Sequence, residues 1–186
     1  MKKIIDIVLS LILLFFLFIP LIIIIVLIKV DSKGPIIHWS DRVGLKNKIF
    51  KMPKFRSMQT NTPQIDTNSL KNPNLYITRV GKYLRRYSFD EIPQLYSIII
   101  GDMSLVGPRP ALYNQDDLIE LRTKHNVHLL LPGITGFAQV NGRDSISITD
   151  KVLLDAFYKK NISTLLDFKI LIQTIDKVFH QEDVSH

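Results

Sequence analysis

Two adjacent acidic residues, Asp90 and Glu91, are the part of this sequence best suited to chemistry. They lie in the stretch 88–95, directly ahead of Pro93 and an apolar run. A carboxylate can attack phosphorus to form an acyl phosphate, and a neighbouring carboxylate can hold Mg²⁺ together with phosphate oxygens. The ordinary alternative is a well-capped helix, because acidic residues are common at helix N-termini. The pair therefore needs support from other residues.

The helix that follows this pair can begin in two ways. Ser88 and Glu91 have the spacing of a capping box, but Pro93 would then lie deeper in the helix and remove a hydrogen bond. With Asp90 as the N-cap, Pro93 falls in the first turn, where backbone N–H groups lack intrahelical partners. We therefore expect Asp90 to cap the helix.

Two later loops, both dense in glycine and proline, each carry an arginine. The first, 101–110, ends in Gly-Pro-Arg-Pro, so that Arg109 lies between two prolines and loses little backbone entropy on binding. The second, 131–143, contains a strand-like segment, Phe137–Val140, and ends on Arg143. Because a guanidinium suits phosphate and carboxylate groups, we expect Arg109 to contact an anion.

Positive charge also precedes the acid pair, and the whole chain has a net charge of +7. Segment 46–56 is rich in lysine and includes Lys54, and a helix expected over 76–86 brings more cations. These charges favour the ionised form of both acids. A solvated face, or attraction to anionic lipid head groups, is the alternative to an anionic ligand.

The elements that must position these residues are helices and short strands in alternation. We therefore expect a small α/β domain of the α+β kind, helix-rich with a short β-hairpin. The expected strands are 36–39 and 48–51, the expected loop is 58–74, and the expected helices are 76–86, 113–128, 150–160 and 163–180. We expect the apolar stripe of the last helix to face the core, with the bilayer surface as the alternative.

The first thirty residues differ from the rest. After two lysines the chain is almost wholly apolar to residue 28, and charged residues follow where a signal peptide would be cleaved. We expect a permanent membrane anchor at 1–30 and one domain with a single core at 31–186. Pro20 divides the apolar run, and neither part could cross a bilayer core of roughly 30 Å alone. A helix–break–helix hairpin and a kinked spanning helix both fit.

The composition excludes several kinds of site. Without cysteine, the chain has no disulfide, thiolate nucleophile or cysteine-ligated zinc. It contains no P-loop, GxGxxG motif or zinc-ligand spacing, and we expect neither His125 nor His128 to bind metal. No nucleic-acid-binding module or aromatic stacking platform accompanies the positive charge, so we expect no nucleic-acid partner.

Three motifs carry a resemblance to a known family. They are Asp-Glu-Ile-Pro-Gln-Leu at 90–95, Gly-Asp-Met-Ser-Leu-Val-Gly-Pro-Arg-Pro at 101–110, and Pro-Gly-Ile-Thr-Gly-Phe-Ala-Gln-Val-Asn-Gly-Arg at 132–143. Together with the proline-broken N-terminal segment, they make the chain resemble the bacterial sugar transferases. It is most similar in kind to the small monotopic phosphoglycosyl transferases that start glycoconjugate assembly, and the resemblance covers nearly the whole chain.

The resemblance implies transfer of a sugar phosphate from a UDP-sugar to a polyprenyl (undecaprenyl) phosphate, with release of UMP. It implies that Asp90 is the nucleophile, which becomes phosphoglycosylated, and that Glu91 binds a Mg²⁺ cofactor. The substrate-binding residues that it implies are Lys54, Arg109, Gln139 and Arg143.

The resemblance also implies a re-entrant anchor broken at proline, which favours the hairpin. The protein would then lie in the bacterial inner (cytoplasmic) membrane with its domain on the cytoplasmic face, and its partners would be the UDP-sugar, the polyprenyl phosphate and the lipid bilayer. Many family members have a serine before that proline, whereas this chain has Ile19, which bears on the geometry of the kink. No motif specifies the sugar or an oligomeric state.

Two other functions compete with this one. A membrane glycosyl transferase would move the sugar without its phosphate and release UDP. A non-catalytic module would bind anionic lipid through its basic face and would be unaffected by Asp90→Asn. The identity of the released nucleotide separates the two enzymes.

Overall fold

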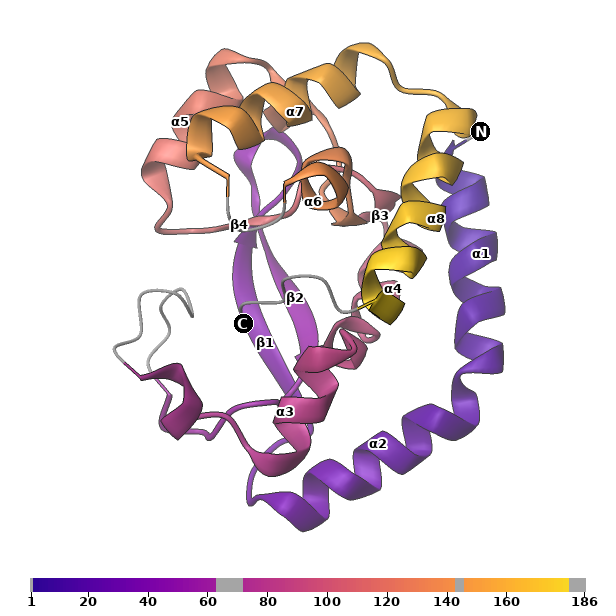
Figure 1. The fold of residues 1–186 in the computed structure, drawn as a ribbon, viewed down its shortest axis with the longest axis vertical. Coiled ribbons are helices and arrows are strands. Elements are labelled where there is room, and N and C mark those ends of the chain that lie inside the picture. Colours follow the sequence, from indigo (N-terminus) through magenta and orange to yellow (C-terminus); the bar gives the residue numbers. More distant parts are fainter. Residues whose placement is uncertain (1, 63–71, 143–145, 181–186) are drawn as a thin grey trace.

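The computed structural model describes residues 2–62, 72–142 and 146–180, and within them it is helix-rich with two small sheets (Figure 1). The helices are α1 (Lys2–Phe16), α2 (Phe18–Asp31), α3 (Arg79–Arg86), α4 (Gln94–Ile100), α5 (Asp116–Lys124), α6 (Phe137–Asn141), α7 (Ile148–Lys160) and α8 (Thr164–His180). The strands are β1 (Ile37–Val43), β2 (Ile49–Phe55), β3 (Ser104–Val106), β4 (Ala111–Leu112) and β5 (Gly133–Thr135). Short 3-10 turns lie at Leu45–Asn47, Pro73–Leu75, Phe89–Glu91 and Val127–Leu129.

The larger sheet is built on the predicted hairpin. β1 and β2 pair antiparallel, with Ile37 opposite Phe55 and Val43 opposite Ile49, and β4 pairs with the other edge of β1. β3 and β5 pair in parallel in a separate sheet. The hairpin prediction is confirmed, and both strands extend further than predicted.

The main core lies where α4, β3, α7 and α8 meet. Ile98, Met103, Tyr158 and Ile170 are each at most 2% exposed and belong to one apolar cluster. The apolar stripe predicted for the last helix faces this core through Ile170. α4 also contacts α1 and β2, and these contacts hold the turn that precedes it.

The N-terminal apolar segment forms two helices, α1 and α2, that meet at a bend of 66°. No single helix in the described part of the chain is long and apolar enough to cross a membrane, whereas the bent pair meets that test jointly by length and composition. The break lies at Leu17, one turn before Pro20, and not at the proline as predicted. Proline has no N–H for the carbonyl of Phe16, four residues earlier, and its ring crowds that carbonyl.

Both ends of this helix pair are bonded to the domain that follows. Lys2 Nζ donates to Asp167 Oδ2 at 2.6 Å, and Ser104 Oγ donates to Asp6 Oδ2 at 2.6 Å, so the first turns of α1 are attached to the core. At the other end, Arg56 donates to carbonyl groups just after α2. In Figure 1 the pair runs along the edge of the domain, α1 near α8 and α2 beyond α3. Most of the large apolar side chains of α1 and α2 are exposed.

Two predicted elements differ from the structure or lie partly outside it. Phe137–Val140, predicted as strand-like, is helical and belongs to α6, where Phe137 stacks on Phe157 of α7 with ring centroids 4.9 Å apart. A short apolar run fits either element, and packing against α7 decides for the helix. The loop predicted at 58–74 lies partly outside the described residues, and within them Met58 forms a bridge to Ile77.

Candidate active site at the acid pair

The acid pair lies in a 3-10 turn, Phe89–Glu91, between α3 and α4. Ser88 precedes it in the left-handed conformation, with a φ of 55°, and its side chain makes no capping hydrogen bond. α4 begins only after Pro93, which occupies the N-cap position. The prediction that Asp90 caps this helix is therefore wrong. The N–H of Glu91 instead bonds to the Ser88 carbonyl within the tight 3-10 turn.

Glu91 is held between two cations from different elements. Lys54 Nζ, on β2, donates to Glu91 Oε1 at 2.8 Å, and Arg109 Nη2, from the loop after β3, donates to the same oxygen at 3.1 Å. Burial acts to raise the pKa of Glu91, but the charges of Arg109 and Lys54 outweigh it and hold this pKa well below its usual range. Glu91 is therefore a carboxylate at any physiological pH.

Asp90 is more deeply buried than its neighbour, with 7% of its surface exposed. Burial is the largest influence and raises the pKa of Asp90 to about 6, while Lys54 and Arg85 oppose the shift and Glu91 adds to it. Arg85 comes from the last turn of α3. The predicted surplus of positive charge is present around both acids, but at Asp90 desolvation outweighs it.

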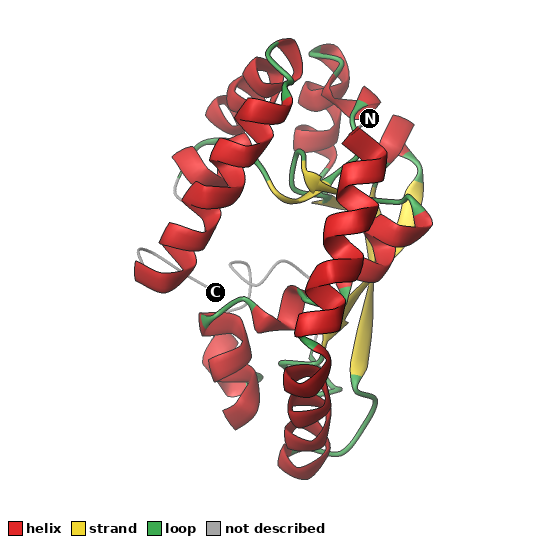
Figure 2. Cartoon of the chain, turned by 90° about the vertical axis from the view of Figure 1, so that its right-hand side faces the viewer, coloured by secondary structure: helices red, strands yellow, loops and turns green. Residues whose placement is uncertain are grey.

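A cavity of about 430 Å³ opens at this site. Its charged part is lined by Glu91 and Arg109, and the wall toward the N-terminal helices is lined by Leu13 and Leu17, at the bend. α8 contributes Thr174, Ile175, Lys177 and Val178. α1 and α8 meet where Lys2 pairs with Asp167 and separate toward the end of α8 (Figure 2). One cavity thus joins Glu91, the chain neighbour of the buried Asp90, to the apolar N-terminal segment.

The remaining predicted residues divide into two cases. Gln139, on α6, lines the same cavity, and its Nε2 donates to the Ile134 carbonyl at 3.0 Å. Arg143 lies outside the described residues. Sequence reasoning missed Lys177 and Tyr87 as cavity-lining residues. Tyr87 directly precedes the acid-pair motif, so its position in the sequence could have indicated a place in the site. Nothing in the sequence of α8 relates Lys177 to the acid pair.

The acid pair offers a small set of oxygen ligands for a metal ion. Within the described ranges, no three His, Cys, Asp or Glu side chains gather as a metal cage. Mg²⁺ is commonly held by one or two carboxylates together with substrate phosphates. Within the described residues, Lys54 and Arg109 both bond to Oε1 of Glu91, so its Oε2 could join phosphate oxygens in holding a Mg²⁺ ion.

Comparison with known proteins gives the chain a family. A family model described as bacterial sugar transferase matches residues 1–181. The chain is 39% identical over 164 residues to the uncharacterized sugar transferase EpsL of Bacillus subtilis. This alignment covers 87% of the chain and 78% of EpsL. It is 35% identical over 167 residues to the exopolysaccharide production protein ExoY of Sinorhizobium fredii, covering 82% of this chain and 74% of ExoY.

A third relative is named by its reaction. The chain is 38% identical over 155 residues to the UDP-N-acetylgalactosamine-undecaprenyl-phosphate N-acetylgalactosaminephosphotransferase of Aeromonas hydrophila. That match covers 81% of this chain but 37% of the relative, so this chain spans little more than a third of the phosphotransferase. The family indicated by the three sequence motifs is confirmed by both the family model and these relatives. The chain belongs to the bacterial sugar transferase family.

Proposed function

We propose that this protein is a phosphoglycosyl transferase that moves a sugar phosphate from a UDP-sugar to a polyprenyl phosphate and releases UMP. One observation supports this above the others: a buried carboxyl group, Asp90, is next in the chain to an ionised, cation-paired Glu91, and Glu91 lines a cavity that reaches the apolar N-terminal segment. The name of the Aeromonas relative contains both the nucleotide-sugar donor and the undecaprenyl-phosphate acceptor.

The cavity suits a substrate with a charged head and an apolar tail. At one end, Arg109 can contact a phosphate, which suits a guanidinium. At the other end, Leu13, Leu17 and Val178 offer an apolar wall continuous with the N-terminal helices. The head of a polyprenyl phosphate would lie near the acid pair, and its isoprenoid chain would follow the wall toward the bilayer.

The reaction would run in two balanced displacements. An oxygen of the Asp90 carboxylate attacks the phosphorus that carries the sugar, and the bond from this phosphorus to the bridging oxygen breaks, so that UMP leaves. An oxygen of the acceptor phosphate then attacks the same phosphorus. The bond to Asp90 breaks, the carboxylate is restored, and the product is a sugar joined to the polyprenol through a diphosphate.

The neighbouring residues would stabilise charge during both steps. Lys54 and Arg109, which contact Glu91, stand where they can also neutralise oxygens of the transferring phosphate. Glu91 would hold Mg²⁺, which supplies further charge stabilisation when bound. Gln139 lines the same cavity and would contact substrate. Arg143, outside the described residues, is proposed as a further substrate contact.

A location at the inner membrane, with the domain on the cytoplasmic face, fits the same features. The helix pair α1–α2 is bonded to the domain at both ends, as a hairpin that enters and leaves one face of a bilayer requires. The outward side of the pair is apolar. Lacking cysteine, the chain also needs no oxidising compartment for its fold.

The proposal is tested by the nucleotide that the reaction releases. Purified protein in detergent, with Mg²⁺, a short polyprenyl phosphate and a panel of UDP-sugars, is expected to release UMP with at least one donor. Asp90→Asn should reduce this by a factor of 10³ or more, on the order of the loss when a covalent nucleophile is removed. The matched control is Glu120→Gln, which alters an exposed carboxylate on α5 and should leave the rate unchanged.

Each other result contradicts a stated part of the proposal. Release of UDP would make the protein a glycosyl transferase and remove the role of Asp90. Absence of both nucleotides across the panel would favour the lipid-binding module. UMP release that survives Asp90→Asn would keep the reaction and exclude Asp90 as the nucleophile.

A further inference from the structure

The loop that carries Arg109 is held by its backbone carbonyl groups. Proline has no N–H, so Pro108 and Pro110 cannot donate backbone hydrogen bonds. Each of three successive carbonyls instead accepts a hydrogen bond from a different element. Gly133 N–H, on β5, donates to Pro108 O at 2.9 Å, and Arg42 Nη1, on β1, donates to Pro110 O at 3.3 Å.

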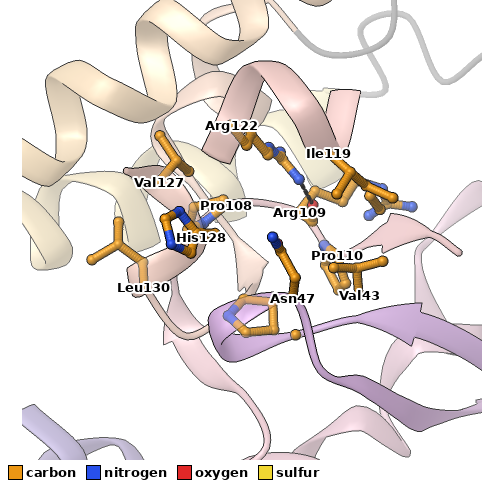
Figure 3. A pocket seen from close by; sticks show the side chains of 13 residues that line it. Val43, Asn47, Pro108, Arg109, Pro110, Ile119, Arg122, Val127, His128 and Leu130 are labelled. Atoms are coloured by element: carbon orange, nitrogen blue, oxygen red, sulfur yellow. Dashed lines mark hydrogen bonds between the residues drawn. The ribbon is translucent and has the colours of Figure 1, made fainter. Parts of the chain in front are cut away.

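The middle carbonyl, that of Arg109 itself, is bonded to a buried arginine. Arg122 Nη1, on α5, donates to Arg109 O at 2.7 Å (Figure 3). The same guanidinium donates through Nε at 3.0 Å and Nη2 at 2.7 Å to Asp155 Oδ2, on α7. Arg122 is 7% exposed and Asp155 is 2% exposed. One side chain thus joins α7, α5 and the backbone of Arg109.

We propose that the buried Arg122–Asp155 pair is a positioning device that aims the Arg109 side chain at the transferring phosphate. The inference rests on the proposed function, because it assigns Arg109 a substrate to meet. Neither member of the pair lines the 430 Å³ cavity or contacts Glu91, so both act through Arg109.

The bonding pattern requires an arginine at position 122. A guanidinium presents donors in a fixed fork, so it can bond to Asp155 on one side and to the Arg109 carbonyl on the other at the same time. A lysine can keep the charge pair with Asp155 but presents only a compact ammonium group. Arg122→Lys therefore keeps the buried charge compensated while it releases the Arg109 carbonyl, which separates positioning from folding.

A double-mutant cycle between positions 109 and 122 tests the proposal. We expect Arg122→Lys to lower kcat/KM for UMP release by a factor of about 10 to 100, the range for a misplaced catalytic group. In the Arg109→Ala background, the same change should lower it by less than about twofold, because its target is gone. If Arg122 acted only on folding, Arg122→Lys would lower kcat/KM by the same factor in both backgrounds. Lys124→Met, an exposed change on α5, should leave the wild-type rate unchanged.

Measuring UDP affinity in the same four proteins reports on the position of Arg109 without requiring turnover. Arg122→Lys should weaken UDP binding in the wild-type background and leave it unchanged in Arg109→Ala. Equal losses in both backgrounds, or an Arg122→Lys variant with wild-type binding and wild-type kcat/KM, would overturn the positioning role. Failure of the proposed function would appear separately, in the identity of the nucleotide released by the wild-type protein.

Discussion

Burial and charge act in opposite directions on the two carboxyl groups of the acid pair. Glu91 contacts Lys54 and Arg109 directly, and these charges keep it ionised in spite of its burial. Asp90 is buried as well, and desolvation is the largest influence on it, outweighing the nearby cations and raising its pKa to about 6. In the proposed reaction Asp90 must be ionised to attack phosphorus, and of the two carboxylates it is the one that protonates first as the pH falls.

The first step should accordingly fail in mild acid. A protonated Asp90 cannot attack, so the rate of adduct formation should be half-maximal near pH 6 and fall about tenfold for each further pH unit. The measurement is formation of the covalent phosphosugar adduct from labelled UDP-sugar without acceptor, which leaves out the ionisation of the lipid phosphate. A rate that stays constant down to pH 5 would contradict the assignment of Asp90.

A pair of variants at position 54 serves as the control for this pH profile. Lys54 lowers the pKa of Asp90, so Lys54→Met should move the midpoint of the profile to higher pH. Lys54→Arg keeps the charge and should keep the midpoint close to that of the wild type. If both variants shift the midpoint equally, the charge of Lys54 does not set the pKa of Asp90.

At the scale of elements, regular patterns were predictable and tight turns were not. The hairpin of β1 and β2 and the helices α7 and α8 follow from periodicity over many residues. The start of α4 does not, because a left-handed Ser88 and a 3-10 turn precede it, and serine rarely adopts that conformation. α6 likewise depends on the stacking of Phe137 on Phe157, a contact between distant parts of the chain.

The residues of the candidate site also divide into those that the sequence could predict and those that it could not. Asp90, Glu91 and Arg109 lie in dense local motifs, so sequence could nominate them, and the structure brings both Arg109 and Lys54 onto Glu91. Arg122 and Lys177 lie on ordinary amphipathic helices, where nothing distinguishes them from surface charges until the fold places them.

The two parallel strands β3 and β5 depend on close backbone approach at Gly133. A side chain here would strike the backbone of Gly107, which cannot move like a flexible side chain. Gly133→Ala should therefore destabilise the protein by about 1–3 kcal/mol, as overpacking does, and displace the Arg109 loop. Thermal unfolding and UMP release measure the two effects. Gly44→Ala is the milder control, because its added methyl mainly meets the ring of Phe50, and equal losses in both variants would contradict this account.

At the scale of the whole molecule, the N-terminal helix pair is built against the domain on one face and exposes apolar side chains on the other. The polar residues Asp6 and Ser10 of α1 are buried against the domain, where Asp6 accepts from Ser104. A helix that carried the N-terminus through a bilayer would break this bond and that of Lys2 to Asp167. The bend at Leu17 instead lets both ends of the pair remain on the domain.

The structure therefore predicts that the N-terminus and the domain lie on the same side of the membrane. Because the chain has no cysteine, Lys3→Cys and, separately, Lys124→Cys each create a unique thiol, both at exposed positions. In sealed inverted membrane vesicles, a membrane-impermeant maleimide should label both variants equally, since both thiols face the outside. In right-side-out vesicles, neither should react until detergent is added. Labelling of the two thiols from opposite faces would mean that α1 and α2 form a kinked spanning helix, and the bonds from Lys2 and Asp6 to the domain would then have to break on insertion.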